Sequence, residues 1–484
     1  MDNDNLLITH LSKKSIIVLS AKIVNFIAVF ASVILLARFF SQTLFGRYQQ
    51  CWLIINTVVP VLILGAPQGL SFFLPRADNN KYRALLCWRF YLLIITAGLM
   101  FLLVVIIFPG IFGRLLGNDQ ITSLEIPLTL LIFFLLPSYC LEALLVINNR
   151  PFLLLVVNIL YAFVFLALHV LCATYSLLTE LFWFLSLLAL GKTVFTLWYT
   201  RNVYAFPFKV REIFNFHALR ILVGYLLTLS IIALLDVLTV QIDKYLVVWF
   251  YKGQETIFAV YSVGAMEIPL VALILGAISS VVMPEFSRLF SQRDIPQALS
   301  LLRIMTYRLN LMLFPLFIFL LCSGFVLVPF FFGVQYRPSI GIFIVYLFLI
   351  PNRIIANHPL LIAGGLQRFA LYGRIIDLVV NVTLGLLLLP VLGYYGPAIS
   401  TITATYFHKM YQIGVIQKFL GVSWTRLYPW RRMGMFAGLC SVCAVLEVLI
   451  VNLLVHPPLV SLLISGVLYG ITMVLLCRKF YAAE

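Results

Sequence analysis

Charged residues are scarce in this sequence. Only 10% of the 484 residues are Asp, Glu, Lys or Arg, against about 25% in soluble domains. Apolar residues make up 63% of the chain, and the mean hydropathy is +1.09. The 33 basic and 17 acidic side chains are too few to cover the surface of a globular protein of this length. The composition excludes a soluble monomer and predicts an all-α polytopic membrane protein.

The groups that most enzymes and metalloproteins need are also missing. The chain has no Gly-rich phosphate loop of the Walker type, so we expect no ATP-driven step. All eight cysteines lie in or beside apolar runs, where Cys acts as a small hydrophobe, so we expect neither a metal site nor a cofactor. About 14 spans of roughly 20 residues fill the length and leave no room for a large catalytic domain. We therefore expect that the protein is not an enzyme.

Apolar runs predict 14 membrane spans. Their centres lie near residues 26, 63, 97, 134, 163, 189, 231, 270, 317, 350, 380, 406, 444 and 468. If both termini are cytoplasmic, the inner connections carry 22 Lys and Arg residues and the outer ones carry six. Basic connections stay inside, so this orientation is the predicted one. This orientation accounts for most of the net charge of +16. Anionic lipids are a sufficient partner for the positive charge, so we expect no binding of nucleic acid.

Two short patterns recur about 210 residues apart. Residues 45–48 (FGRY) are echoed by 258–261 (FAVY), and residues 64–66 by 275–277 (both LGA). The repeat predicts two six-helix lobes of the same orientation around a central cavity, followed by two C-terminal helices. The predicted parts are an N-lobe at 1–205, a C-lobe at 206–420 and an appendage at 421–484.

Three stretches carry a resemblance to a known family. They are Leu35 to Pro67, Val260 to Arg288, and Asn381 to Ala398 with its Leu392-Gly393-Tyr394-Tyr395-Gly396-Pro397 sequence. All three resemble the Wzx family of polysaccharide flippases, which is related to the lipid II flippase MurJ and to MATE drug exporters. The resemblance implies alternating-access transport of an undecaprenyl-diphosphate-linked oligosaccharide across the bacterial inner membrane, as in O-antigen and lipopolysaccharide assembly. It also implies coupling to H⁺ or Na⁺ and cooperation with a polysaccharide polymerase and a chain-length regulator.

Basic side chains inside the predicted spans are the candidates for binding a diphosphate. A charge there costs about 2.5–3.5 kcal/mol on insertion scales and seldom persists without a polar cavity or a partner. Arg353, near the middle of the tenth span, is the first candidate because a guanidinium binds phosphate oxygens in pairs; the alternative is a bracing pair with an acid. Lys22, Arg308 and Lys192 complete the predicted cavity cations, although Lys22 alternatively snorkels to the cytoplasmic surface.

Carboxylates inside the predicted spans are the candidates for ion coupling. A buried carboxyl can load and release a proton in the physiological range. Glu267, predicted halfway through the eighth span, is the expected carrier, with a hydrogen bond to a neighbouring helix as the alternative. Asp236 and Asp243 lie seven residues apart on one stripe of the seventh span and are the other candidates. For Asp243 we favour a surface pair with Lys244 at the outer end.

The remaining polar groups of the spans receive structural or glycan-facing interpretations. Arg374 and Asp377, three apart on a predicted helix, are expected to form a structural pair. Glu142 and His169 are expected near span ends, where water solvates them, and Lys409 at the rim of the cavity. Three side chains are candidates for contact with the glycan: Tyr346, Asn352 and Asn25.

Two other functions compete with a flippase. A membrane-embedded polysaccharide polymerase or glycosyltransferase needs acids and cations gathered in a sizeable outer loop, but every predicted outer connection is short. A MATE-like multidrug exporter needs an acidic cavity for lipophilic cations, whereas the deep charges here are mostly basic. An anionic cargo therefore fits the predicted spans better.

Overall fold

The computed structural model describes residues 2–77, 79–204, 210–454 and 458–481. The regular secondary structure of these residues is entirely helical. Ten of their helices are long and apolar enough to cross a membrane. Two shorter apolar helical stretches lie at Ser339–Ile354 and Ile464–Cys477. The predicted all-α polytopic fold is confirmed, whereas the predicted number of 14 spans is not.

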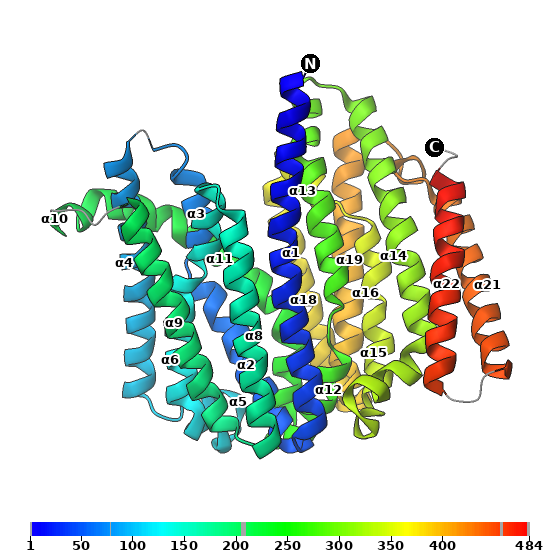
Figure 1. Ribbon diagram of the computed structural model, residues 1–484. Helices are drawn as coiled ribbons and strands as arrows, with labels where there is room; N and C mark the ends of the chain where they lie inside the picture. The colour runs from blue at the N-terminus through cyan, green and yellow to red at the C-terminus, as the bar shows by residue number, and fades with distance from the viewer. Residues whose placement is uncertain (1, 78, 205–209, 455–457, 482–484) are drawn as a thin grey trace. The chain divides into compact units, whose positions relative to one another are not determined.

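The helices form two compact units (Figure 1). The first unit is Met1–Gln241 with Val248–Ala259, and the second is Ile242–Val247 with Val260–Glu484. The predicted boundary at 205/206 falls among residues outside those described, and the division at 420/421 stays a prediction.

The first unit contains the N-terminal helices. Its best-packed pairs are α1 with α8 and α6 with α9. The helices are α1 (Asp2–Phe39), α2 (Gln42–Leu62), α3 (Ala66–Phe73), α4 (Asn80–Ile107), α5 (Ile111–Leu116), η1 (Asp119–Leu124), α6 (Glu125–Ser138), α7 (Cys140–Ile147), α8 (Pro151–Tyr175), α9 (Leu178–Tyr204), α10 (Val210–Ile213) and most of α11 (Phe216–Phe250).

The second unit contains the C-terminal helices from Val260 in α12 onward, together with Ile242–Val247 of α11. Helices α18 and α19 pack along each other, and α21 packs on α14 and on α22. The helices are α12 (Glu255–Gly264), α13 (Pro269–Ser291), α14 (Ile295–Phe332), η2 (Val334–Tyr336), α15 (Ser339–Leu347), α16 (Leu349–Ile354), α17 (His358–Ala363), α18 (Gln367–Leu392), α19 (Tyr395–Leu420), α20 (Trp424–Leu427), α21 (Trp430–Leu454) and α22 (Pro458–Tyr481).

Several predicted spans are interrupted helices. Between α2 and α3 the backbone turns through Leu64 and Gly65, whose φ angles are 53° and 60°. Residues 265–268 separate α12 from α13, and residues 355–357 separate α16 from α17. A non-helical stretch at membrane depth is tolerated where it is buried in protein or lines a polar cavity. Thirteen of the fourteen predicted centres fall inside helices, and the other, residue 63, lies at the first break.

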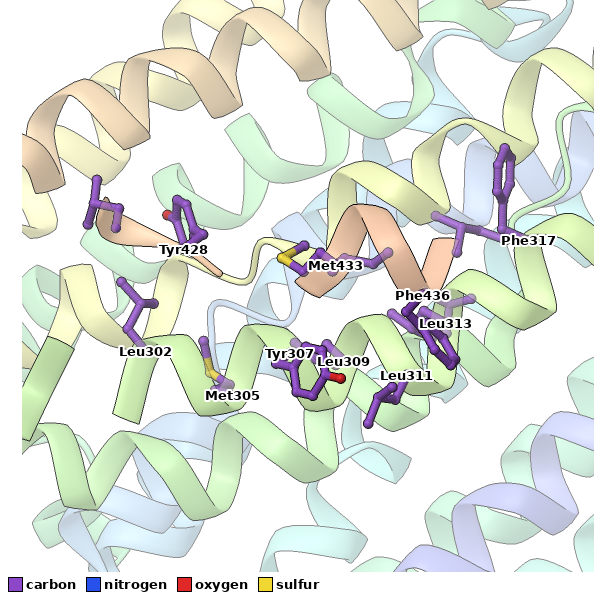
Figure 2. Close-up of a cluster of buried hydrophobic side chains, with 14 of the residues drawn as sticks. Leu302, Met305, Tyr307, Leu309, Leu311, Leu313, Phe317, Tyr428, Met433 and Phe436 are labelled. Atoms are coloured by element: carbon purple, nitrogen blue, oxygen red, sulfur yellow. The ribbon is translucent and has the colours of Figure 1, made fainter. Parts of the chain in front are cut away.

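A cluster of buried apolar side chains joins α14 to α21 in the second unit (Figure 2). Helix α14 contributes Leu309 and Leu313, among others, and α21 contributes Phe436, which is fully buried. Lipid tails are as apolar as these side chains, so the contact is stabilised by close packing rather than by release of water. The cluster fixes the C-terminal helices to the unit that contains the charged groups described below.

Truncation of Phe436 tests this packing. We expect Phe436→Ala to lower the free energy of unfolding by about 3 kcal/mol, because it leaves a cavity that the neighbouring helices fill only in part. The measurement is thermal unfolding of the purified protein in detergent. Met435→Ala is the matched control, because Met435 is on the same helix with 55% of its surface exposed. Equal effects of the two substitutions would contradict the role of the cluster.

Candidate functional site

Arg353 and Glu267 form an ion pair in the second unit. Nη2 of Arg353 lies 2.6 Å from Oε2 of Glu267, and the two side chains keep 27% and 38% of their surface exposed. Arg353 is in the last turn of α16, and Glu267 lies in the non-helical stretch before α13, not halfway through a helix as predicted. Both line a small pocket of about 20 Å³. The predicted phosphate-binding cation and the predicted ion carrier therefore neutralise each other.

Helix α19 supports the broken helices that carry Arg353. Lys409 donates from Nζ to the carbonyl oxygen of Ile355 at 2.6 Å, just beyond the end of α16. Asn352 donates from Nδ2 to the carbonyl oxygen of Thr405 at 3.2 Å and is 4% exposed. The carbonyl of Ile355 is freed by the helix break and needs such a donor when no water is near. Lys409 thus satisfies the backbone, and the prediction that Asn352 meets the glycan is wrong because its side chain is buried.

Asp243 is a fully buried carboxylate on α11. Its Oδ2 accepts a hydrogen bond from the hydroxyl of Tyr261 at 2.6 Å and a second one from the hydroxyl of Tyr346. Its Oδ1 has no partner among the described residues. The expected surface pair with Lys244 is therefore wrong, and Tyr346 binds this carboxylate and not a glycan. Asp236, on the same helix, is half-buried.

Two cations of the first unit gather around one acid. Nζ of Lys22, on α1, lies 2.9 Å from Oε1 of Glu142 on α7, with the two side chains 50% and 44% exposed. Lys192, on α9, is close enough to interact electrostatically with Glu142. Its ammonium lies 4.5 Å from the ring centroid of Tyr161, a cation–π distance. Glu142 lies near the end of the span Asp119–Ile147 and is partly exposed, as expected, but its pair with Lys22 was not predicted.

The other predicted residues are spread over both units. Arg308 is exposed on α14 in the second unit. Arg374 and Asp377 do pair, at 3.9 Å, and Asp377 also lies 3.3 Å from Nδ1 of His408. His169 is not solvated at a span end: it is fully buried, with Nε2 3.2 Å from the hydroxyl of Tyr48.

The sequence analysis gave Glu142 no functional role, although a signal for one was present. Glu142 is the one acid between residues 126 and 179, in a run that is otherwise nearly all apolar. An isolated acid in such a run marks a functional site or a partner more often than a solvated end. Each unit thus presents an exposed cation held by a single carboxylate, Lys22 with Glu142 and Arg353 with Glu267.

The chain is similar to known transporters in fold. A structure titled lipid II flippase MurJ, inward closed conformation, has a TM-score of 0.70 at 15% identity, covering 96% of this chain and 99% of that one. An inward-facing multidrug resistance MATE family transporter has a TM-score of 0.63 at 13% identity, over 82% and 96%. A mutant of the Vibrio cholerae MATE transporter VcmN has a TM-score of 0.57 at 12% identity, over 86% and 99%.

A family match adds to the likeness in fold. No curated protein sequence matches the chain at a significant level. The family model described as polysaccharide biosynthesis protein matches residues 35–341. The predicted kinship with polysaccharide flippases of the MurJ and MATE fold is therefore confirmed in family and in architecture. The protein is a multi-pass membrane protein that belongs to the polysaccharide biosynthesis protein family and has the fold of a flippase or transporter.

Proposed function

We propose that the protein moves an undecaprenyl-diphosphate-linked oligosaccharide from the inner to the outer leaflet of the bacterial inner membrane. The family supports a polysaccharide as cargo, and the fold supports transport rather than catalysis. Transport proceeds by alternating access with both termini in the cytoplasm, and it is coupled to a gradient of H⁺ or Na⁺. A polysaccharide polymerase and a chain-length regulator then use the flipped product.

The observation that carries this proposal is the pairing of Lys22 and Arg353, each with a single carboxylate. Both pairs are partly exposed, so a ligand can reach them. A diphosphate offers more negative charge and more acceptor oxygens than one carboxylate, and it binds a guanidinium through two parallel hydrogen bonds. It is therefore able to displace Glu142 or Glu267 from its cation. A lipophilic cation, the cargo of a drug exporter, gains nothing from these sites.

Coupling fits the buried Asp243 better than Glu267. Glu267 already balances the charge of Arg353 at 2.6 Å. Asp243 has two tyrosine donors on one oxygen and a second oxygen with no partner among the described residues. A carboxylate out of water gains from binding a proton or a small cation, because either removes an uncompensated charge.

Loss of the gene tests the proposed function. We expect undecaprenyl-diphosphate-linked oligosaccharide to accumulate, with its sugars on the cytoplasmic face, because the units are made there and not moved. Mass analysis of the extracted polyprenyl-linked sugars identifies the cargo, and protection from an added glycosidase in right-side-out vesicles reports the leaflet. A plasmid copy of the gene should reverse both effects. Unchanged lipid-linked sugars in the deletion strain would reject the proposal.

A further inference from the structure

A groove lined by apolar side chains and a few polar ones lies within the first unit. It runs past the break between α2 and α3 and along α7, and its volume is about 820 Å³. Pockets for single drug-sized ligands measure roughly 300–1,000 Å³. All its lining residues but Arg76 belong to two candidate spans, Gln42–Phe73 and Asp119–Ile147.

We propose that this groove binds the sugar residues of the lipid-linked cargo. Two amide side chains carry the argument. Asn56, on α2, and Gln68, on α3, both line the groove and are exposed. Neither makes a hydrogen bond with the residues that the structure describes. An amide facing hydrocarbon without a partner costs several kcal/mol, roughly 2–7, so these two side chains face water or a polar ligand.

The chemistry of the free groups suits sugar hydroxyls. Each amide has two N–H donors and a carbonyl acceptor, which match neighbouring hydroxyls that both donate and accept. Two rings line the same groove, Tyr139 with 49% of its surface exposed and Phe72 with 41%. The exposed ring of Tyr139 provides apolar area for the C–H face of a sugar ring, as aromatic faces do for other amphipathic ligands.

The two charges of the groove are already engaged within the protein. Arg76 lies with its guanidinium carbon 3.8 Å from the ring centroid of Phe72, and it donates to the carbonyl oxygen of Phe72 at 2.6 Å. Glu142 is paired with Lys22. The groups left for a ligand are neutral, and this favours the glycan over the phosphates as the occupant.

The position of Glu142 connects the groove with the proposed function. The inference of a glycan-binding groove rests on that function. Glu142 lines the groove and holds Lys22 at 2.9 Å. A diphosphate that displaces Glu142 from Lys22 lies at one edge of the groove, and the first sugar is attached to it directly. The sugars that follow then extend along Asn56 and Gln68, so these amides act on the cargo's glycan and not on its lipid.

Binding by the purified protein tests the inference. Two ligands are compared: the lipid-linked oligosaccharide purified from the deletion strain, and undecaprenyl diphosphate without sugar. We expect the double substitution Asn56→Ala with Gln68→Ala to weaken binding of the first ligand about 10- to 100-fold, the effect of two lost hydrogen bonds. Binding of undecaprenyl diphosphate should stay the same. Both residues are exposed, so thermal unfolding should not change.

Two further variants distinguish a failure of the groove inference from a failure of the proposed function. Gln254→Ala removes an exposed amide outside the groove and should leave both affinities unchanged. Lys22→Ala should weaken the binding of both ligands, because both carry the diphosphate. Equal affinity of the wild-type protein and the double variant for the oligosaccharide would reject glycan binding in the groove. It would leave the proposed flippase function intact. Equal weakening of both ligands in the double variant would assign the groove to phosphate. Failure of the wild-type protein to bind either ligand would reject the proposed function itself.

Discussion

Arg353→Ala is expected to reduce export of the lipid-linked oligosaccharide roughly 100-fold while the protein reaches the membrane at normal levels. Hydrogen bonds to a charged group contribute about 1.5–3 kcal/mol, and 1.4 kcal/mol is a factor of ten. The substitution also leaves Glu267 without its cation at 2.6 Å, so the pocket becomes negative and repels a phosphate. The measurement is surface polysaccharide together with the lipid-linked units that remain in the inner leaflet.

A bracing role for the same pair gives a different result. The double substitution Arg353→Glu with Glu267→Arg reverses the pair and should restore thermal stability. If Arg353 binds phosphate from its position on α16, export should remain lost in this variant. Recovery of export would assign the pair a structural role only. Arg288→Ala is the matched control, because Arg288 forms an exposed pair with Glu285 in the same unit, and it should export normally.

Asp243→Asn is expected to abolish the dependence of transport on an ion gradient. Asparagine has nearly the same shape and keeps an oxygen that accepts from Tyr261 and Tyr346, so the fold should persist. It cannot carry a proton or balance a bound cation in the buried site. The measurement is flipping in proteoliposomes with an imposed pH gradient or an imposed Na⁺ gradient, and the gradient that stimulates the wild-type protein identifies the ion.

Substitutions of Asp243, Asp236 and Glu267 are compared to decide which acid couples transport to the ion gradient. Glu285→Gln removes the same charge from an exposed pair on α13 and should leave stimulation intact. Asp236→Asn and Glu267→Gln address the remaining candidates within the spans. Stimulation that survives in Asp243→Asn but disappears in one of these two would remove Asp243 from the mechanism and name the carrier.

Hydropathy predicted the helices well because it reports on each segment by itself. Thirteen of the fourteen centres lie in helices, but the breaks that carry the site were not predicted. Glu267 lies in one such break, and the apolar run continues on both sides of it. Its partner Arg353 is 86 residues away along the chain, so no periodic pattern connects the two.

The wrong prediction for Asp243 has a local cause. Adjacent residues on a helix do not face each other, so Lys244 was a poor choice of partner. The two tyrosines that bind Asp243 come from α12 and α15, and only the packing of three helices brings them together. The ion pair of Glu142 with Lys22 was not predicted for a similar reason, since it depends on the packing of α1 and α7.

The pairing of Lys22 and Arg353 with single acids also bears on what the resting protein excludes. A bacterium holds its interior at a negative potential, worth about 2.3 kcal/mol per charge at 100 mV, which drives small anions outward through any conducting path. A bare lysine or arginine within the bilayer would gather chloride and inorganic phosphate into such a path. With Glu142 and Glu267 in place, each of these two cations already has a carboxylate as its partner. We therefore expect the idle protein to leak few anions, because a monovalent anion gains little by displacing the carboxylate already paired with each cation.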